Sequence, residues 1–97
     1  MEETSVRKII WDRKAAVDAK IAEEGFLDLP PEEQDALVMS LQLGVDLEVV
    51  RRCVADTATE AELAEVRAKA AEAFQYGKRK ALRALRTAIA NYPKLRD

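Results

Sequence analysis

A chain of 97 residues, 48% of them hydrophobic, is long enough for one folded domain and too apolar to be disordered by composition. Seventeen residues are alanine, so we expect thin, closely packed helices around a small core that a second copy could complete. The chain has no histidine, three glycines and one cysteine, Cys53. The absence of histidine excludes catalysis and metal binding by histidine, and the other two counts exclude glycine-rich phosphate loops and an internal disulfide.

The net charge of −2 predicts no strong attraction to nucleic acids or membranes. No apolar stretch approaches the ~18 residues of a membrane span, and the acidic start of the chain does not resemble a signal peptide. A single cysteine fits a reducing compartment. The sequence therefore predicts a cytoplasmic, non-enzymatic protein with no cofactor, no metal ion, no membrane and no small-molecule substrate.

Helical periodicity over the whole chain predicts one all-α domain, 1–97, and no stretch alternates with period two. The first helix is expected at about 5–24, followed by Gly25 as a left-handed cap and by Phe26 folded back onto the last turn. Pro31 begins the second helix, 31–43, which stops at Gly44.

Asp46 can cap a third helix, 47–55, and two overlapping capping-box patterns, Thr57–Glu60 and Thr59–Glu62, precede the fourth. The fourth helix is expected at 60–91, ends before Pro93 and leaves 93–97 as a frayed tail. At 32 residues it would span roughly 48 Å and would project beyond its neighbours. A glycine within a helix costs only about 1 kcal/mol, so a continuous or mildly kinked helix is favoured over a break at Gly77.

Charge is distributed unevenly along the chain. Residues 28–65 carry ten acidic and two basic residues, a net charge of −8, whereas 76–97 carry one acidic and seven basic residues, a net charge of +6. On a helical wheel Arg79, Arg83 and Arg86 share a face that Lys80 flanks. A solvated face is the favoured interpretation, and a docking surface for phosphates or for an acidic protein is the alternative.

Residues 36–55 place a small residue, Ser40, four positions before a glycine, Gly44. Apolar residues suited to contacts between two helices surround that glycine: Met39, Leu43, Val45, Val50 and Cys53. The segment resembles the helix-turn-helix motif of DNA-binding proteins. The resemblance implies that 47–55 would be the recognition helix, with Arg51 and Arg52 near DNA. By architecture alone, such a corner followed by a long helix is also similar to the small terminase subunits of tailed viruses.

The residues that would face the groove begin with Asp46, Leu47 and Glu48, and two carboxylates there oppose the approach of phosphates. A purely structural helix corner is therefore the favoured interpretation of this segment. Trp11 lies off the apolar stripe of its helix and is interpreted as half-buried core or, alternatively, as an interface residue. The candidate interface residues are Trp11, Phe74, Tyr76 and Lys78.

The leading hypothesis is a small helical protein that binds itself or a protein partner through its long helix and its charge poles. The second is a helix-turn-helix DNA-binding protein, either a regulator or a DNA-recognition subunit. The third is an acidic inhibitor that occupies a nucleic-acid-binding protein. The candidate contacts for nucleic acid or an acidic partner are Arg51, Arg52, Arg79, Lys80, Arg83 and Arg86.

Overall fold

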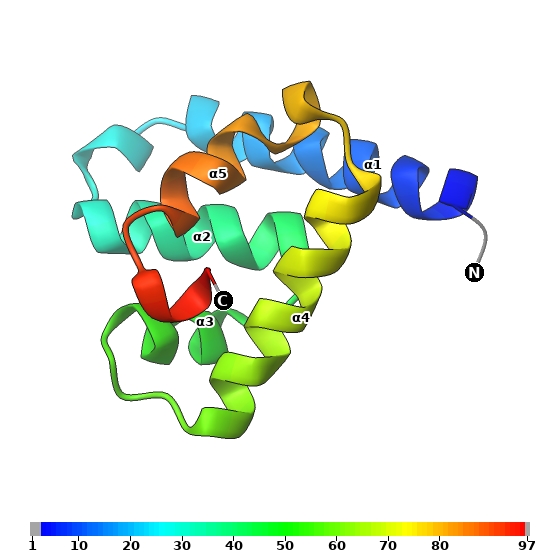
Figure 1. Cartoon of the computed structure of the whole chain (residues 1–97). Coiled ribbons are helices and arrows are strands. Elements are labelled where there is room, and N and C mark those ends of the chain that lie inside the picture. Colours follow the sequence, from blue (N-terminus) through cyan, green and yellow to red (C-terminus); the bar gives the residue numbers. More distant parts are fainter. Residues whose placement is uncertain (1–2, 97) are drawn as a thin grey trace.

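The computed structural model describes residues 3–96, which form an all-helical fold without strands (Figure 1). This confirms the all-α expectation, with one more α-helix than the sequence suggested. The described residues contain five α-helices: α1 (Glu3–Ala22), α2 (Pro31–Leu43), α3 (Leu47–Val54), α4 (Glu60–Tyr76) and α5 (Arg83–Ile89). The same part of the chain has three 3-10 helices between or after them: η1 (Phe26–Asp28), η2 (Arg79–Leu82) and η3 (Pro93–Leu95).

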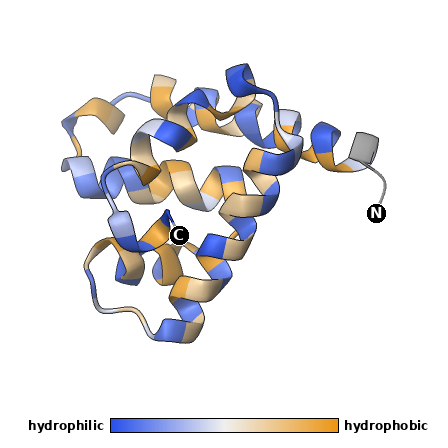
Figure 2. Cartoon of the chain, in the orientation of Figure 1, coloured by the Kyte–Doolittle hydropathy of each residue, from blue (hydrophilic) through white to orange (hydrophobic). Residues whose placement is uncertain are grey.

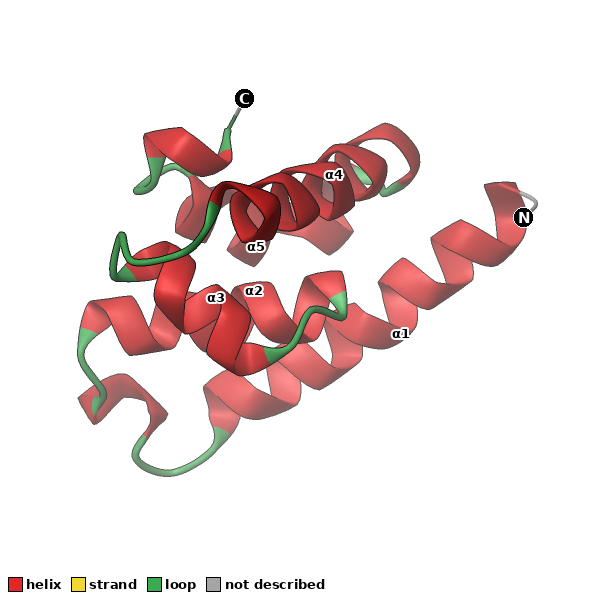
Figure 3. Ribbon diagram, turned by 90° about the horizontal axis from the view of Figure 1, so that it is seen from below, coloured by secondary structure: helices red, strands yellow, loops and turns green. Residues whose placement is uncertain are grey.

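Helix α2 is central and contacts α1, α3, α4 and α5. Figure 1 shows α1 and α5 on one side of α2, α3 on the other, and α4 crossing one end of the arrangement. The first turns of α1 extend beyond the other helices (Figure 3). Within residues 3–96, no helix has the length and apolar character that crossing a membrane requires.

The predicted helix ends follow from local chemistry. Gly25 and Gly44 adopt left-handed backbone conformations, with φ of 90° and 68°, after α1 and α2. The Asp46 carboxylate accepts a hydrogen bond from the Glu48 amide at 3.2 Å and caps α3. Of the two capping boxes, the structure forms the one between Thr59 and Glu62.

The core is a single cluster of small and medium apolar side chains. Every helix has hydrophobic and hydrophilic stretches, as expected of helices that bury one face (Figure 2). Deeply buried hydrophobic side chains come from α2, α3, α4, η2 and α5: Met39, Leu43, Val50, Val66, Leu82 and Leu85. Gln42 is also buried, and its amide donates a hydrogen bond to the Ile10 carbonyl at 3.1 Å, which links α2 to α1.

The prediction of one helix over 60–91 is wrong. Helix α4 ends at Tyr76, and Gly77 and Lys78 are extended, with ψ of 145° and 149°. The chain then turns through η2 into α5, so that Leu82, Leu85 and Ile89 are buried in the core instead of projecting past it. The energy gained by burying these side chains outweighs the few hydrogen bonds that a continuous helix would add.

The frayed tail predicted over 93–97 is also corrected for its described residues. Residues 93–95 form η3, and Leu95 is only 2% exposed. Arg67 donates a hydrogen bond to the Lys94 carbonyl at 2.9 Å, and the Lys94 ammonium pairs with Asp56 at 2.5 Å. One buried leucine and these two contacts hold the segment against α4 and the turn after α3, while Asp97 lies outside the described residues.

Candidate functional site

The α2–α3 corner has the packing that the helix-turn-helix resemblance implied. The Ser40 hydroxyl donates a hydrogen bond to the Val45 carbonyl at 2.7 Å, across the left-handed turn at Gly44. The five apolar residues assigned to the helix contact are all buried: Met39, Leu43, Val45, Val50 and Cys53. Burial raises the pKa of the Cys53 thiol, which disfavours the reactive thiolate.

Arg51 and Arg52, the residues assigned to DNA contact, are bound to carboxylates of the same chain. The Arg51 guanidinium holds Glu33 of α2 in a two-point contact at 2.6 and 3.1 Å, and it also pairs with Glu48. The hydrogen bonds from Arg51 hold the pKa of Glu33 below its ordinary value. These contacts tie α3 to α2, so a phosphate would have to compete with two carboxylates for Arg51.

The Arg52 guanidinium contacts both carboxylate oxygens of Glu62, with Nε at 3.2 and 3.1 Å. Glu62 also accepts the Thr59 amide at 3.0 Å in the capping box. The hydrogen bonds from Arg52 and Thr59 lower the pKa of Glu62 to about 2. Arg52 therefore joins α3 to the start of α4, and its charge is already balanced.

The second predicted basic group lies entirely after Gly77 and is divided between two short helices. Arg79 and Lys80 lie on η2, while Arg83 and Arg86 lie on α5, and all four side chains are exposed. Arg86 stacks over the Phe74 ring, 4.9 Å from its centre. Within residues 3–96, Arg79, Lys80 and Arg83 form no ion pair, so their charges are available to a partner, unlike those of Arg51 and Arg52.

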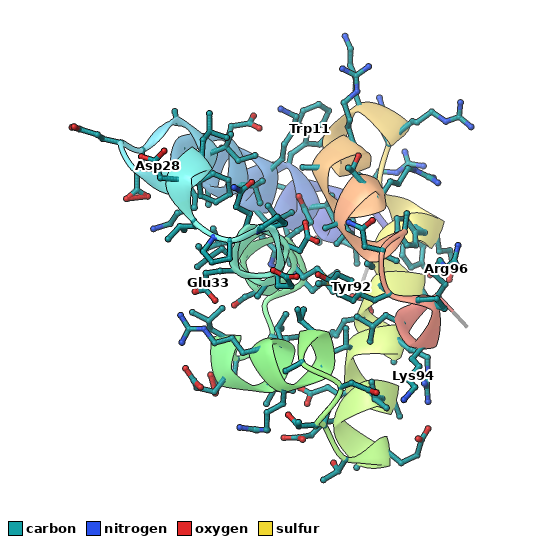
Figure 4. All side chains as sticks on the ribbon, turned by 90° about the vertical axis from the view of Figure 1, so that its left-hand side faces the viewer. Trp11, Asp28, Glu33, Tyr92, Lys94 and Arg96 are labelled. Carbon is teal, nitrogen blue, oxygen red and sulfur yellow. The ribbon has the colours of Figure 1, made fainter. Side chains whose placement is uncertain are left out.

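A groove of about 830 Å³ runs between α1, α2, η1 and the η2–α5 segment. Its floor consists of buried apolar side chains, including Val17, Val38 and Ala88. Trp11 and Leu27, at its edges, are 41% and 75% exposed. In Figure 4, Trp11 of α1 lies next to the ribbon of η2 and α5. The groove is thus lined by α1 from the N-terminal part of the chain and by η2 and α5 from the C-terminal part.

Charged side chains accompany the two exposed hydrophobic residues. Lys80 and Arg83 line the groove together with Trp11, and the Lys14 ammonium lies 5.8 Å from the centre of the Trp11 ring. Lys14 also pairs with Asp18 at 2.5 Å. Lys80 and Arg83 make the η2 end of the groove basic.

The η1 end of the groove is firmly held, and a carboxylate, Asp28, follows its lining residue Leu27. Asp28 points outward from the fold (Figure 4). The Gln34 amide donates hydrogen bonds to the carbonyls of Leu27 and Leu29, at 3.3 and 2.9 Å. Two hydrogen bonds from α2 thus fix the short 3-10 helix that carries Leu27 and Asp28. These two residues are therefore held in position at this end of the groove.

The other predicted interface residues lie elsewhere. Phe74 and Tyr76 are half-buried near the end of α4, where the Tyr76 carbonyl accepts a hydrogen bond from Arg7 at 3.2 Å. Lys78 is exposed in the extended link after Gly77. Of the four, Trp11 alone lines the groove. Sequence reasoning missed Leu27, whose signal was a large apolar residue between Phe26 and Asp28 in a short connection.

No protein-family model matches the chain, and comparisons with curated proteins and with solved structures give no match. The groove, its exposed hydrophobic residues and the cations beside them are the features of this fold that can bind a partner.

Proposed function

We propose that the chain is a non-enzymatic helical binding protein, which associates with itself or with a protein partner through the groove between α1, α2 and α5. The observation that carries this proposal is the exposure of Trp11 and Leu27 on the two edges of an apolar hollow. The other large hydrophobic side chains described are buried or half-buried. The long helix of the leading hypothesis has no part in it, because α4 ends before Gly77.

Exposed apolar residues at a concave surface gain free energy when a partner covers them, by about 25 cal/mol for each Å² of apolar area. Tryptophan is enriched among the residues that dominate binding energy in protein interfaces. Leu27 adds a flexible apolar side chain on a 3-10 helix that Gln34 holds in place. The groove therefore offers a partner two exposed contact residues, Trp11 and Leu27, above a floor of buried apolar side chains that are already packed.

The charge distribution supports the same surface. The cations of α3 and η3 are bound to carboxylates within the chain, as Arg51 is to Glu33 and Lys94 is to Asp56. Lys80 and Arg83, at the groove, have no such partner among the described residues. A partner that carries carboxylates beside its apolar contact residues would meet these cations without displacing an existing ion pair.

The test is affinity capture of binding partners from the native host, with and without nuclease. We expect the wild-type chain to retain a protein partner after nuclease treatment, and a Trp11→Ala/Leu27→Ser variant to lose it. An Ala64→Ser/Ala68→Ser variant, altered on the exposed face of α4, is the control and should capture as the wild type does. Equal capture by the groove variant would contradict the proposal.

DNA binding is the second candidate function, and the α2–α3 corner favours it through Ser40, Gly44 and the buried contacts around them. The ion pairs of Arg51 and Arg52 weigh against it, because phosphates would have to displace Glu33, Glu48 and Glu62. If the chain binds DNA, Arg51→Ala and Arg52→Ala should each weaken duplex binding and flatten its salt dependence. Absence of salt-sensitive duplex binding at about 50 mM salt would exclude this candidate.

An acidic inhibitor needs carboxylates that are available to a basic partner. Half of the ten acidic side chains between 28 and 65 already form ion pairs in the chain: Glu33, Glu48, Asp56, Glu60 and Glu62. This pairing reduces the free negative charge of the segment and weighs against the third hypothesis.

A further inference from the structure

We infer that the occupant of the groove is a second copy of the chain, in a two-fold dimer where Leu27 of each copy packs beside Trp11 of the other. The inference rests on the proposed function and identifies the partner that it leaves open. Charge and apolar surface are arranged along the groove so that they complement those of a second copy whose groove runs in the opposite direction.

The groove has two different ends. Trp11 lines one end with Lys80 and Arg83, and Leu27, followed by Asp28, stands at the η1 end. Ile21 lines the groove ten residues after Trp11, a rise of about 15 Å along α1, and η1 lies beyond it. An apolar residue therefore marks each end, with cations beside one and a carboxylate beside the other.

A two-fold axis that crosses the groove at its middle, perpendicular to its length, brings the η1 end of one copy to the η2 end of the other. Such an interface is isologous, so each contact occurs twice. Asp28 of one copy then faces Lys80 and Arg83 of the second, while Leu27 enters the hollow beside Trp11. Two copies placed in the same direction would instead set cation against cation, which repels.

The charges that this dimer would use are not engaged within one copy. Lys80 and Arg83 form no ion pair among residues 3–96, and neither do Asp28 and Glu24, which lie in η1 and in the turn before it. No existing pair has to break before the two copies meet. The Lys14–Asp18 pair lines the groove between the two ends, so it lies near the two-fold axis.

The available surface sets the expected strength. A standard interface covers about 800 Å² of each partner, and the whole chain exposes 6039 Å². The groove with its two edges is a modest part of that surface, so we expect a reversible dimer with a dissociation constant in the micromolar range. Salt should weaken it, because the charged contacts lie at the exposed ends of the groove.

The test uses light scattering after size exclusion, from micromolar to millimolar chain concentration, together with the emission of Trp11. Because Trp11 is the single tryptophan, its emission should shift to shorter wavelength as the dimer forms. A Lys80→Glu/Arg83→Glu copy and a Glu24→Lys/Asp28→Lys copy should each be monomeric, with dissociation constants raised more than about tenfold. Circular dichroism should show that both are folded.

Mixing the two charge-reversed copies provides the decisive result. Their charges are complementary at both ends, so the mixture should regain the dimer mass and the Trp11 shift. A Lys69→Glu/Arg96→Glu copy carries the same change in net charge at exposed cations outside the groove and should dimerise like the wild type.

The inference is overturned if the wild type stays monomeric at every concentration, if the charge-reversed copies dimerise like the wild type, or if the mixture does not regain the dimer. These outcomes are separable from failure of the proposed function. A monomer whose capture of a host protein depends on Trp11 and Leu27 would overturn the inference alone. A monomer without such capture would overturn both.

Discussion

The Leu82 side chain lies directly against the backbone of Gly77. A β-carbon added at Gly77 would lie 2.8 Å from Leu82 Cδ1 and 2.8 Å from the Ala73 carbonyl oxygen, closer than real β-carbons approach their neighbours. Leu82 is fully buried, so it cannot move away without leaving the core. This contact turns the chain from α4 toward α2 and places Lys80, Ala81 and Arg83 at the groove.

The first prediction concerns Gly77→Ala, which should lower the free energy of unfolding by about 1–3 kcal/mol, the usual cost of overpacking a core. Helix propensity alone predicts the opposite, a gain of about 1 kcal/mol. Urea denaturation measures the difference. Gln75→Ala, at an exposed position in the last turn of α4, is the control and should change stability by less than about 0.5 kcal/mol. A stabilised Gly77→Ala variant would favour the continuous helix.

The break at Gly77 illustrates what local sequence patterns could not predict. The capping box of Thr59 and Glu62 and the turns at Gly25 and Gly44 were predictable, because each depends on residues a few positions apart. The helical periodicity of the sequence continues on both sides of Gly77. The break there is favoured by the packing of Leu82 against Gly77 in the core, which local patterns do not contain. Local propensity is a weak signal when core packing opposes it.

The candidate site was only partly predictable for the same reason. Trp11 could be recognised because it lies off the apolar stripe of its own helix. Its neighbour Lys80 comes from the far end of the chain, and the turn at Gly77 brings it there. Arg51 and Arg52 are candidate contacts by sequence, but Arg51 is bound to Glu33 on α2 and Arg52 to Glu62 on α4, partners that lie ten or more residues away in the chain.

The second prediction concerns the turn between α2 and α3. At Gly44 a β-carbon would lie 2.6 Å from Arg13 Nη2, and φ is +68°. Gly44→Ala should therefore lower the free energy of unfolding by about 1–2 kcal/mol, because alanine is strained in the left-handed backbone conformation. The loss should be larger still, because Arg13 must also give up the hydrogen bond that it donates to the Leu43 carbonyl at 3.3 Å. In an Arg13→Ala background the loss should shrink by about 0.5–1.5 kcal/mol. Equal losses in both backgrounds, measured with urea, would show that Arg13 is not involved.

The third prediction concerns alkaline pH. The Tyr92 hydroxyl donates to the Asp35 carboxylate at 2.9 Å, and burial together with this carboxylate raises the pKa of Tyr92 above its ordinary value of 10. Because the folded state favours the protonated phenol, this contribution to stability is complete below pH 10 and is lost as pH rises further.

Tyr92→Phe should lower the free energy of unfolding by about 0.5–1.5 kcal/mol at neutral pH, the net value of one hydrogen bond. Above pH 10 its stability should fall less steeply than that of the wild type, since the phenol no longer titrates. Urea denaturation at a series of alkaline pH values gives both slopes. The same slope in variant and wild type would argue against a role of Tyr92 in the alkaline loss.

The last prediction concerns acid pH and the link between α3 and α4. Hydrogen bonds from Arg52 and the Thr59 amide lower the pKa of Glu62 from 4.5 to about 2, so the folded state favours the ionised carboxylate. This stabilisation is complete above pH 4.5 and is lost as pH falls toward about 2. Glu62→Gln keeps an oxygen for the Thr59 amide but removes the charge, so the decline of stability over this pH range should become shallower. Glu65→Gln, at an exposed position on α4 without an ion pair among the described residues, is the control and should keep the wild-type slope. If both variants keep that slope in urea denaturation, the contact with Arg52 does not contribute to the acid sensitivity of the fold.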